Sequence, residues 1–401
     1  MPDSHSPPDR VKVVHLTSTH LADDARIFAK ECSGLARAGY DVSLVIPDNR
    51  CLTDDGRPVR RQEVDIVALK RRPGLVGRLL RTTSAVVAAG LRLKGDVYHF
   101  HDPELIPAGL LLRLLGKRVI YDVHEDLPRD ILTRTWIPKP LRPPIAAVAE
   151  AVEWLAGRTM SGVVAATPTI TKRFPKHKTA LVQNFALFTE FKGDGDPPFA
   201  ERRGVAFAGT ICADRCAVEM VDAMARVADP RAKMLLAGGV ETAALKRAME
   251  ASPGWPRVEF RGRVDRAGVQ KLLGESRVGL ALYYPTQNYI DTQPVKLYEY
   301  MAAGIPVITA DFPYHRGLIE THRCGLCVNC TDPDAIAQAI QWMFDHPEEA
   351  EAMGRRGREA VKAHFNWANE EARLMQLYDR VGPAYGMLQP GMMRSEMDGR
   401  P

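Results

Sequence analysis

A chain of 401 residues, with 45% hydrophobic and 26% charged side chains, has the composition of a globular protein, and its length predicts two or three domains. Its 54 basic residues are interspersed with 49 acidic ones, so a formal charge of +5 does not predict a nucleic-acid-binding protein. The charge is compatible with an anionic small ligand or with an anionic membrane surface. No apolar stretch is long enough for a membrane-spanning helix.

Both ends of the chain are predicted to be disordered. Residues 1–10 are polar and proline-rich and lack the apolar core of a signal peptide, and residues 386–401 show no hydrophobic pattern. We therefore expect a cytoplasmic protein. The 7 cysteines, an odd number without a secretory signal, predict reduced thiols rather than a disulfide framework.

Short β-branched runs alternate with helical stretches through the first half of the chain. The predicted strands are near-continuous apolar runs, as expected when helices cover both faces of a sheet. They are residues 11–16, 42–46, 64–69, 97–100, 118–122, 162–167 and 180–184. Between the first two, residues 23–38 are predicted to form a helix with Asp23 and Asp24 in its first turn. Its expected buried face consists of Phe28, Cys32, Leu35 and Ala36.

A polar, proline-bearing stretch, residues 193–204, predicts a linker between two domains. More strands are predicted after it, at residues 205–209, 233–238, 258–262, 278–284, 306–310 and 325–329. Two successive βα series predict an α/β protein with two doubly wound parallel-sheet, Rossmann-like domains, over residues 11–192 and 201–365. The glycine fingerprint of a dinucleotide site and the Walker-type phosphate loop are both missing from the sequence.

The segment YIDTQPVKLYEYMAAGIPVITAD, residues 289–311, carries the strongest chemical signal. Pro294 stands where a helix should begin, and its expected buried face is Val295, Tyr298, Met301 and Ala302. The preceding turn, Asp291-Thr292-Gln293, should leave backbone N–H groups free to bind a pyrophosphate. Lys296 and Glu299 are expected to share the other helix face, with Glu299 placed to accept hydrogen bonds from a ribose.

At this point the sequence resembles a known family. Asp291-x(7)-Glu299, running into EYMAAGIPVI, resembles the acidic-x(7)-Glu signature of the retaining glycosyltransferases of family four (group 1). The P-x-K-L-x-E-Y-M-A-A-G block resembles the polysaccharide-assembly subset of that family. The resemblance extends from Val11 to about Val381 and implies a GT-B fold, in which the two Rossmann-like domains face each other across a cleft.

The resemblance also implies the substrates. It assigns the donor ribose to Glu299 and the donor sugar to Asp291, a position where the family usually has glutamate. It implies a nucleotide-diphosphate sugar as donor, a glycan or lipid-linked acceptor, and neither a metal nor another cofactor. Catalysis would use no established protein nucleophile, because the phosphate leaving group is thought to help deprotonate the acceptor.

Two further segments of the second half resemble donor-binding elements of the family. In FAGTICADRC, Gly209 matches the family's glycine and Arg215 a basic residue that holds the diphosphate. Thr210 stands where a second cation is expected, and we expect Lys296 to supply that charge. In FRGRVDRAG, Gly262 and Arg263 match the loop near the nucleobase. The alternative for Arg215 is an ordinary surface arginine.

Histidine and acidic residues cluster at predicted strand ends in the first half, in YHFHDPE and YDVHEDLP. The resemblance places His124 on the acceptor side, where it would position the donor sugar and the acceptor. It places His101 and Asp102 facing the cleft, and His20 and Asp24 along the acceptor cleft. The alternative is that these histidines only form hydrogen bonds in strand-end turns.

The segment HFNWANEEARLMQLYDRV resembles the C-terminal helix of the family, which crosses back onto the first domain. We expect this helix within residues 366–385. Its predicted packing face consists of Trp367, Leu374, Leu377 and Tyr378. Such a helix would act as a strap at the hinge between the domains.

Residues 66–95 hold several lysines and arginines and no acidic residue. They predict either a basic amphipathic helix in peripheral contact with an anionic membrane or an ordinary Rossmann helix with a solvated basic face. The loop Arg134 to Pro144 would add a tryptophan and further cations to that contact. The first alternative places the protein at the inner face of the cytoplasmic membrane.

Other functions remain open from the sequence. One is a nucleotide-sugar epimerase of the same fold. Another is a metal-dependent hydrolase built on His99, His101, Asp102 and His124, and a third is a non-catalytic partner. Cys324, Cys327 and Cys330 have the spacing of a metal motif, but no further ligand pair follows them.

Overall fold

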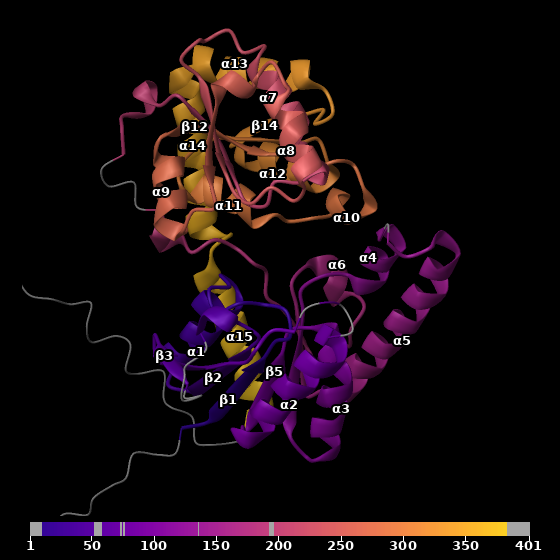
Figure 1. Ribbon diagram of the computed structural model, residues 1–401. Coiled ribbons are helices and arrows are strands. Elements are labelled where there is room, and N and C mark those ends of the chain that lie inside the picture. Colours follow the sequence, from indigo (N-terminus) through magenta and orange to yellow (C-terminus); the bar gives the residue numbers. More distant parts are fainter. Residues whose placement is uncertain are drawn as a thin grey trace, which may run out of the picture. The chain divides into compact units, whose positions relative to one another are not determined.

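The computed structural model describes residues 10–51, 58–72, 74, 77–134, 136–191 and 196–382. The predictions of disordered ends fall outside these residues, apart from Arg10. The chain divides into two compact units, each built around its own sheet (Figure 1). The first unit contains residues up to 125, 148–182 and those from 371 onward, and the second contains residues 126–147 and 183–370.

The first sheet has the order β3-β4-β2-β1-β5-β6-β7-β8 and is parallel except for β3. Its strands are β1 (Lys12–Leu16), β2 (Asp41–Ile46), β3 (Val59–Arg61), β4 (Val64–Ala68), β5 (Val97–Phe100), β6 (Arg118–Val123), β7 (Gly162–Ala165) and β8 (Thr179–Leu181). Each strand predicted for this half is present. The sequence did not predict β3, because this edge strand is short and its arginines are exposed, so it shows no apolar run.

Helices connect these strands. They are η1 (Ile27–Cys32), α1 (Ser33–Arg37), η2 (Asn49–Cys51), η3 (Gly77–Thr82), α2 (Thr83–Arg92), η4 (Pro103–Leu105), α3 (Ile106–Leu114), α4 (Leu127–Thr133), η5 (Lys139–Leu141), α5 (Arg142–Thr159) and α6 (Pro168–Thr171).

The helix predicted for residues 23–38 begins later, at Ile27. Asp24 precedes it, and its carboxylate accepts hydrogen bonds from the amides of Arg26 and Ile27 at 2.9 and 2.8 Å. An acidic side chain before the first turn satisfies amides that have no partner within the helix, which explains the shift. The predicted buried face is confirmed for Phe28, Cys32, Leu35 and Ala36.

Residues 66–95 do not form one long helix. They include the end of β4, then η3 and α2, with residues 73, 75 and 76 outside the described ranges. α2 buries Val86, Ala89 and Gly90, and a Cβ built on Gly90 would lie 2.6 Å from Leu16 of β1. Packing of this kind is typical of a Rossmann helix that covers its own sheet.

The second sheet is parallel throughout, with the order β11-β10-β9-β12-β13-β14. Its strands are β9 (Gly204–Ala208), β10 (Lys233–Ala237), β11 (Val258–Gly262), β12 (Ser276–Ala281), β13 (Val307–Ala310) and β14 (Gly325–Val328), again as predicted within two residues at each end except at the end of β12. The strand order reverses between β9 and β12. In open α/β sheets this is where ligands bind, beyond the carboxyl ends of the strands.

Helices connect the strands of this half of the chain, and α15 follows the last of them. They are η6 (Phe188–Glu190), η7 (Phe199–Glu201), η8 (Ala213–Arg215), α7 (Ala217–Met224), α8 (Ala243–Glu250), η9 (Trp255–Arg257), α9 (Arg266–Gly274), α10 (Gln287–Ile290), α11 (Val295–Ala302), α12 (Pro313–His322), α13 (Pro333–Asp345), α14 (Pro347–Ala363) and α15 (Trp367–Val381).

Part of the predicted linker is packed. Phe199 is buried in the core of the second unit, and Gly204 is already the first residue of β9. The apolar Phe199 explains why the chain does not run free there. Residues 193–195 of the predicted linker lie outside the described ranges.

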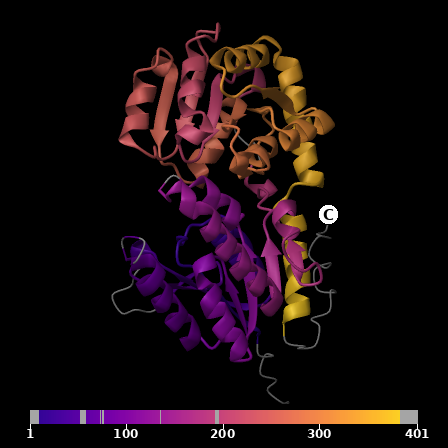
Figure 2. The same ribbon diagram turned by 90° about the vertical axis from the view of Figure 1, so that its right-hand side faces the viewer.

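The helix α15 packs as its sequence pattern predicts, with Trp367, Leu374, Leu377 and Tyr378 all buried. From residue 371 onward it groups with the first unit. A Cβ built on Gly162 of β7 would lie 3.1 Å from Leu377, so the helix lies against the first sheet, as Figure 2 shows.

Candidate functional site

Two glycines at adjacent strand ends bring backbone segments close together in the second unit. Gly209 follows β9 with a φ of 132°, and Gly238 follows β10 with a φ of 148°. The Gly209 amide donates to the Ala237 carbonyl at 3.0 Å. A Cβ on Gly238 would lie 1.8 Å from the Gly209 carbonyl oxygen, so no other residue fits there. The backbone at the end of β9 is therefore fixed and open to a ligand.

Arg215 and Lys296 converge on this position, as predicted. A Cβ built on Gly209 would lie 3.4 Å from Nη1 of Arg215 and 3.5 Å from Nζ of Lys296. Nη1 of Arg215 donates to the Thr210 carbonyl at 2.9 Å, and Thr210 itself is exposed. Within the described residues, neither Nε of Arg215 nor Nζ of Lys296 has a hydrogen-bond partner.

Lys296 was predicted on the helix face other than the buried one, but it is itself buried. Only 7% of Lys296 is exposed, and its ammonium lies 3.7 Å from the centroid of the Phe207 ring. Because Lys296 belongs to the first turn of α11, its side chain reaches the end of β9 instead of solvent. Burial first, and Arg215 second, lower the pKa of Lys296 well below its usual value. In the described part of the chain, neither of these two neighbouring cations is hydrogen-bonded to a carboxylate. Together they form a site for an anion.

The turn before α11 differs in detail from its prediction. Pro294 is the residue before the helix, with ψ at 129°, rather than its first residue. The Thr292 amide is not free, since it donates to the Tyr289 carbonyl at 3.2 Å. The Thr292 carbonyl in turn accepts a hydrogen bond from Nε2 of His315 at 3.2 Å. This buried histidine fixes the turn, and no pattern in the sequence predicts that role.

Glu299 lies one turn further along α11, with 14% of its side chain exposed. Its carboxylate accepts a hydrogen bond from Nη1 of Arg266 at 2.7 Å, and Arg266 also binds Glu190. The carboxylate of Glu299 is thus held by a cation and retains lone pairs for a further donor.

Asp291 and Gln293 lie on either side of the same turn. Asp291 ends α10 with 58% of its side chain exposed, and its carboxylate lies 3.4 Å from Nη1 of Arg129. The Gln293 side chain accepts a hydrogen bond from Gln183. Asp291 is the most exposed of the predicted donor-site acids and is free to reorient.

The predicted nucleobase loop lies next to these glycines. Gly262 ends β11 with a φ of 63°, and its carbonyl accepts from the Gly238 amide at 2.7 Å. Arg263 is exposed, and a Cβ on Gly239 would lie 2.9 Å from its Nε. Its guanidinium therefore lies flat over the backbone after β10, where a planar base could stack.

In the first unit, the predicted acceptor-side residues come together. Nδ1 of His20 lies 2.9 Å from the Asp24 carboxylate, and the rings of His20 and His124 have centroids 5.3 Å apart. The rings of His101 and His124 have centroids 5.4 Å apart. Burial lowers the pKa of His20, but the hydrogen bond to Asp24 and the charges of Asp24, Asp102 and Asp122 together raise it above its usual value.

Asp102 is not placed among the histidines as the predicted metal-dependent hydrolase site would require. Its buried carboxylate accepts hydrogen bonds from the Thr17 hydroxyl at 2.6 Å, from the Ser18 amide at 2.7 Å, and from the Thr19 hydroxyl. It reaches His20 only at 3.8 Å. Asp102 therefore holds the loop after β1 in shape, so that His20 is presented.

A continuous chain of hydrogen bonds runs through the buried histidines. His99 Nδ1 lies 2.8 Å from the Tyr378 hydroxyl, which lies 3.3 Å from Nε2 of His15. Nδ1 of His15 lies 2.9 Å from Nε2 of His101. Nδ1 of His101 lies 3.0 Å from Asp122. Burial lowers the pKa of each of these three histidines, so all are neutral and carry one proton.

Asp122 sets the direction of this chain. A carboxylate only accepts, so His101 donates to Asp122 from Nδ1, and its Nε2 must accept from His15. The same oxygen of Asp122 accepts from Nε2 of His124 at 2.7 Å. This fixes the proton of His124 on Nε2 and leaves Nδ1 as an acceptor on a side chain that is 18% exposed.

The sequence interpretation did not identify Asp122, Arg26 or Glu31. Asp122 could have been found from its place two residues before His124 in YDVHEDLP. The guanidinium of Arg26 lies 3.0 Å from Asp122 and 3.0 Å from Glu31. Arg26 and the two histidines keep the pKa of Asp122 well below its usual value despite burial. Burial, with Asp122 nearby, raises the pKa of Glu31.

One group of described side chains has the spacing of metal ligands, namely Glu31, His99, His101 and Asp122, whose ligand atoms lie within 4.8 Å of one another. It is not the set predicted for a hydrolase, because Asp102 and His124 are replaced by Glu31 and Asp122. The guanidinium of Arg26 already supplies a positive charge to both carboxylates.

The cysteine motif has ordinary packing. Cys324 and Cys330 are buried, and the Cys330 thiol donates to the Tyr283 carbonyl at 2.9 Å. Burial raises the pKa of Cys324 to about 12. No metal-ligand group within the described ranges includes these cysteines.

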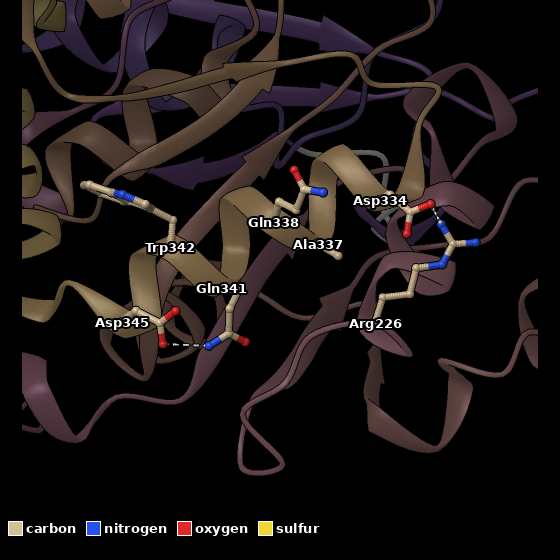
Figure 3. Close-up of a pocket in the computed structure, with 7 residues that line it drawn as sticks. All are labelled: Arg226, Asp334, Ala337, Gln338, Gln341, Trp342 and Asp345. Carbon is tan, nitrogen blue, oxygen red and sulfur yellow. Dashed lines mark hydrogen bonds and ion pairs between the residues drawn. The ribbon is translucent and has the colours of Figure 1, made fainter.

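A surface hollow of 390 Å³ lies along α13, as Figure 3 shows. It contains none of the predicted site residues, and it is lined by Arg226, Asp334, Ala337, Gln338, Gln341, Trp342 and Asp345. Its polar groups are paired, Arg226 with Asp334 at 3.0 Å and Gln341 with Asp345 at 2.7 Å. The hollow therefore offers no free charge to an anionic ligand.

Comparison with known protein families gives two matches. The family described as glycosyl transferases group 1 matches residues 200–360, which include the Arg215, Lys296 and Glu299 positions. The glycosyl transferase 4-like domain matches residues 25–179, which include the His101 and His124 positions.

Individual proteins are similar over part or all of the chain. D-rhamnosyltransferase WbpZ of Pseudomonas aeruginosa is 31% identical over 33% of this chain and 30% of its own length. The chain thus spans about a third of the length of the first curated relatives it matches. Sucrose-phosphate synthase of Thermosynechococcus elongatus has a similar structure, with a TM-score of 0.73 and 19% identity over 92% of this chain and 99% of that chain. Alr3699/HepE of Anabaena, solved in complex with UDP and glucose, gives a TM-score of 0.67 and 14% identity over 92% and 99%. The chain therefore has a GT-B fold, and its two halves match a glycosyl transferase 4-like domain and a glycosyl transferases group 1 domain.

Proposed function

We propose that this protein is a retaining glycosyltransferase that moves a hexose-type sugar from a nucleotide-diphosphate sugar to a glycan or lipid-linked acceptor in surface polysaccharide assembly. A relative named as a D-rhamnosyltransferase and a structural neighbour solved with UDP and glucose support this type of donor and reaction. The P-x-K-L-x-E-Y-M-A-A-G block supports the polysaccharide role by its resemblance alone.

The observation that carries the proposal is the buried, unpartnered ammonium of Lys296 beside Arg215 at Gly209. Bringing two cations together in a buried place is unfavourable unless an anion joins them. A nucleoside diphosphate supplies that anion. As the glycosidic bond breaks, negative charge grows on the leaving diphosphate, and the two cations stabilise it.

The residues around these cations would bind the remaining parts of the donor. Glu299 accepts hydrogen bonds from the ribose diol, and Arg263 lies under the nucleobase. Asp291, Thr292 and Gln293 contact the sugar, with Asp291 reorienting from Arg129 when the donor binds.

On the acceptor side, Nδ1 of His124 accepts a hydrogen bond from a hydroxyl of the donor sugar or the acceptor. Asp122 holds the histidine ring in the tautomer that this requires. The leaving diphosphate, rather than a protein nucleophile, takes the acceptor proton. We expect the reaction to use no metal, since the guanidinium of Arg26 already pairs with Asp122 and Glu31.

The decisive experiment is a thermal-shift screen with UDP-, GDP-, ADP- and dTDP-sugars, followed by binding to the Lys296→Met and Arg215→Met variants. A donor should stabilise the wild-type protein, and each variant should lose affinity for the diphosphate while binding of the nucleoside alone is unchanged. Equal affinity of the variants for the diphosphate would refute the assignment.

The anomeric configuration of the product, followed by NMR, tests the retaining mode. An inverted product would overturn it. Conversion of the donor to its epimer without an acceptor would show an epimerase instead. Activity that disappears with a chelator and returns with zinc would show the metal-dependent hydrolase.

A further inference from the structure

The helix α5 exposes an apolar surface that the donor and acceptor sites do not use. Ile145, Val148, Val152 and Leu155 follow one another at spacings of three and four residues, so they form one stripe on the helix. Each is exposed, Val148 by 64%, and Trp154 beside them is exposed by 52%. An apolar stripe of this kind normally faces a protein core.

This stripe is additional to the face with which α5 packs. The inner face already buries Ala146, Glu153 and Ala156, and a Cβ on Gly157 would lie 2.6 Å from Phe174. The helix is therefore apolar on its inner side and on its outer side. Soluble monomers rarely expose a continuous apolar surface of this size unless something covers it.

The neighbouring helix extends the surface. Nε of Arg113 in α3 donates to the Thr159 carbonyl at the end of α5, at 2.9 Å, so the two helices end side by side (Figure 1). Leu111, Leu114 and Leu115 at the end of α3 are exposed, Leu114 by 86%. In the segment that leads into α5, Trp136 and Leu141 are exposed as well.

The charges around the stripe are mostly positive. The carboxylate of Glu153 is buried and bound by Arg173 at 2.6 Å, which leaves Glu150 as the exposed acid of α5. Lys139 and Arg142 stand at the start of the helix, and Arg158 stands at its end. Arg158 stacks on the ring of Trp154, with 3.7 Å between its guanidinium carbon and the ring centroid.

We propose that the outer face of α5, with the exposed end of α3, inserts into the headgroup region of an anionic lipid bilayer. Aliphatic side chains with tryptophans and cations at their border match the polarity gradient of a bilayer surface, and the cations match anionic headgroups. No helix of the described chain is long and apolar enough to cross a bilayer. The contact is thus peripheral.

This proposal moves the membrane contact away from residues 66–95. On α2 the exposed large apolar residue, within the described ranges, is Leu91 at 37%, and the neighbouring exposed residues are small or charged. The described basic face of α2, on which Leu91 is the exposed large apolar residue, gives electrostatic attraction but little insertion.

The test is flotation of the full chain with vesicles of phosphatidylcholine alone and with 30 mol% phosphatidylglycerol. The double variant V148E/V152E places two carboxylates on the stripe and should lower the partition coefficient for anionic vesicles by roughly tenfold or more. Its matched control, the charge-reversed pair R81E/R92E at the exposed basic face of η3 and α2, should lower it by less than threefold. The fluorescence of Trp154 should shift to the blue with anionic vesicles, and W154F should remove most of the shift.

Circular dichroism and thermal unfolding of the variants should match the wild type, since each substituted side chain is exposed. Binding lost in R81E/R92E but kept in V148E/V152E would overturn the proposal in favour of the basic segment. A concentration-dependent dimer in light scattering, abolished by V148E/V152E, would show that a second copy covers the stripe instead. Donor binding to the second unit is measured separately, so failure here leaves the proposed function unaffected.

Discussion

The carboxylate of Asp122 accepts a hydrogen bond from Nε2 of His124 at 2.7 Å and another from Nδ1 of His101 at 3.0 Å. One buried oxygen thus fixes the proton positions of two rings. The exposed nitrogen of His124 is an acceptor because Asp122 lies beneath it.

Replacing Asp122 with asparagine tests this relationship. An amide can donate as well as accept, so the ring of His124 is no longer held with its proton on Nε2, and we expect kcat to fall by roughly 10²-fold or more with the donor KM within threefold. The substitution also removes one of the two buried carboxylates that Arg26 binds, which should lower the free energy of unfolding by about 3–5 kcal/mol. Because the two residues act as a unit, D122N/H124A should be no slower than H124A alone. Additive losses would contradict the positioning role.

Replacing Lys296 with methionine should change stability and binding in opposite directions. Burial lowers the pKa of Lys296, so the unfolded chain binds its proton more readily than the native protein does, and the ammonium destabilises the free protein at neutral pH. We expect K296M to stabilise the free protein by roughly 1–4 kcal/mol and to abolish the rise in melting temperature caused by a nucleoside diphosphate. Thermal unfolding with and without the diphosphate measures both effects. A K296M protein that is less stable than the wild type and still binds the diphosphate would exclude the anion site.

Glu299 and Glu190 offer a matched pair, because both carboxylates bind Arg266. We expect E299Q to weaken donor binding by roughly 10- to 100-fold, since it removes a charged acceptor from the ribose. E190Q removes a similar partner from Arg266 without touching the proposed ribose site and should change donor affinity by less than threefold. Calorimetric titration of both variants distinguishes ribose binding from a general effect on Arg266.

Acid should destabilise the first unit. Burial lowers the pKa values of His15, His99 and His101, so below about pH 6.5 the unfolded chain takes up protons that the native protein does not. Stability is therefore lost as pH falls through this range, by up to about 1.4 kcal/mol per pH unit for each histidine. His20 acts in the opposite sense, because its pKa is raised and its stabilisation is lost only as pH rises through that value.

The variant H99N checks this acid dependence. Asparagine retains a donor toward Tyr378 but does not titrate. The slope of unfolding free energy against pH between 5 and 6.5 should therefore decrease by an amount equivalent to the uptake of up to one proton. Urea unfolding at several pH values gives the slope. An unchanged slope would mean that His99 is not a neutral buried base.

The sequence predicts most of the fold because its strands are apolar runs that neither loops nor surface helices show. β3 was not predicted, because this strand has exposed arginines and therefore no apolar run. Helix boundaries shifted by one to four residues, at Pro294 and Ile27, because capping side chains decide where a helix begins and periodicity does not.

Some residues of the candidate site could be predicted from the sequence, and others could not. Residues at strand ends, such as Gly209, Arg215 and His124, could be identified because the position after a strand is where ligands bind. The burial of Lys296 could not, since helical periodicity places it beside Glu299 and only the end of β9 determines where its long side chain goes. Arg26 and His315 act through residues distant in sequence, which no local pattern reveals, whereas Asp122 stands two residues before His124.

The hydroxyl of Tyr378 in α15 joins His99 of β5 to His15 of β1 inside the first unit. Both of these strands come before residue 124 in the chain. During synthesis, the ribosome must therefore translate the whole second sheet before α15 can complete the first unit. Until then the histidines lack the Tyr378 hydroxyl, and the part of the first sheet that α15 covers stays exposed. A chain truncated just before α15 would lack this contact permanently.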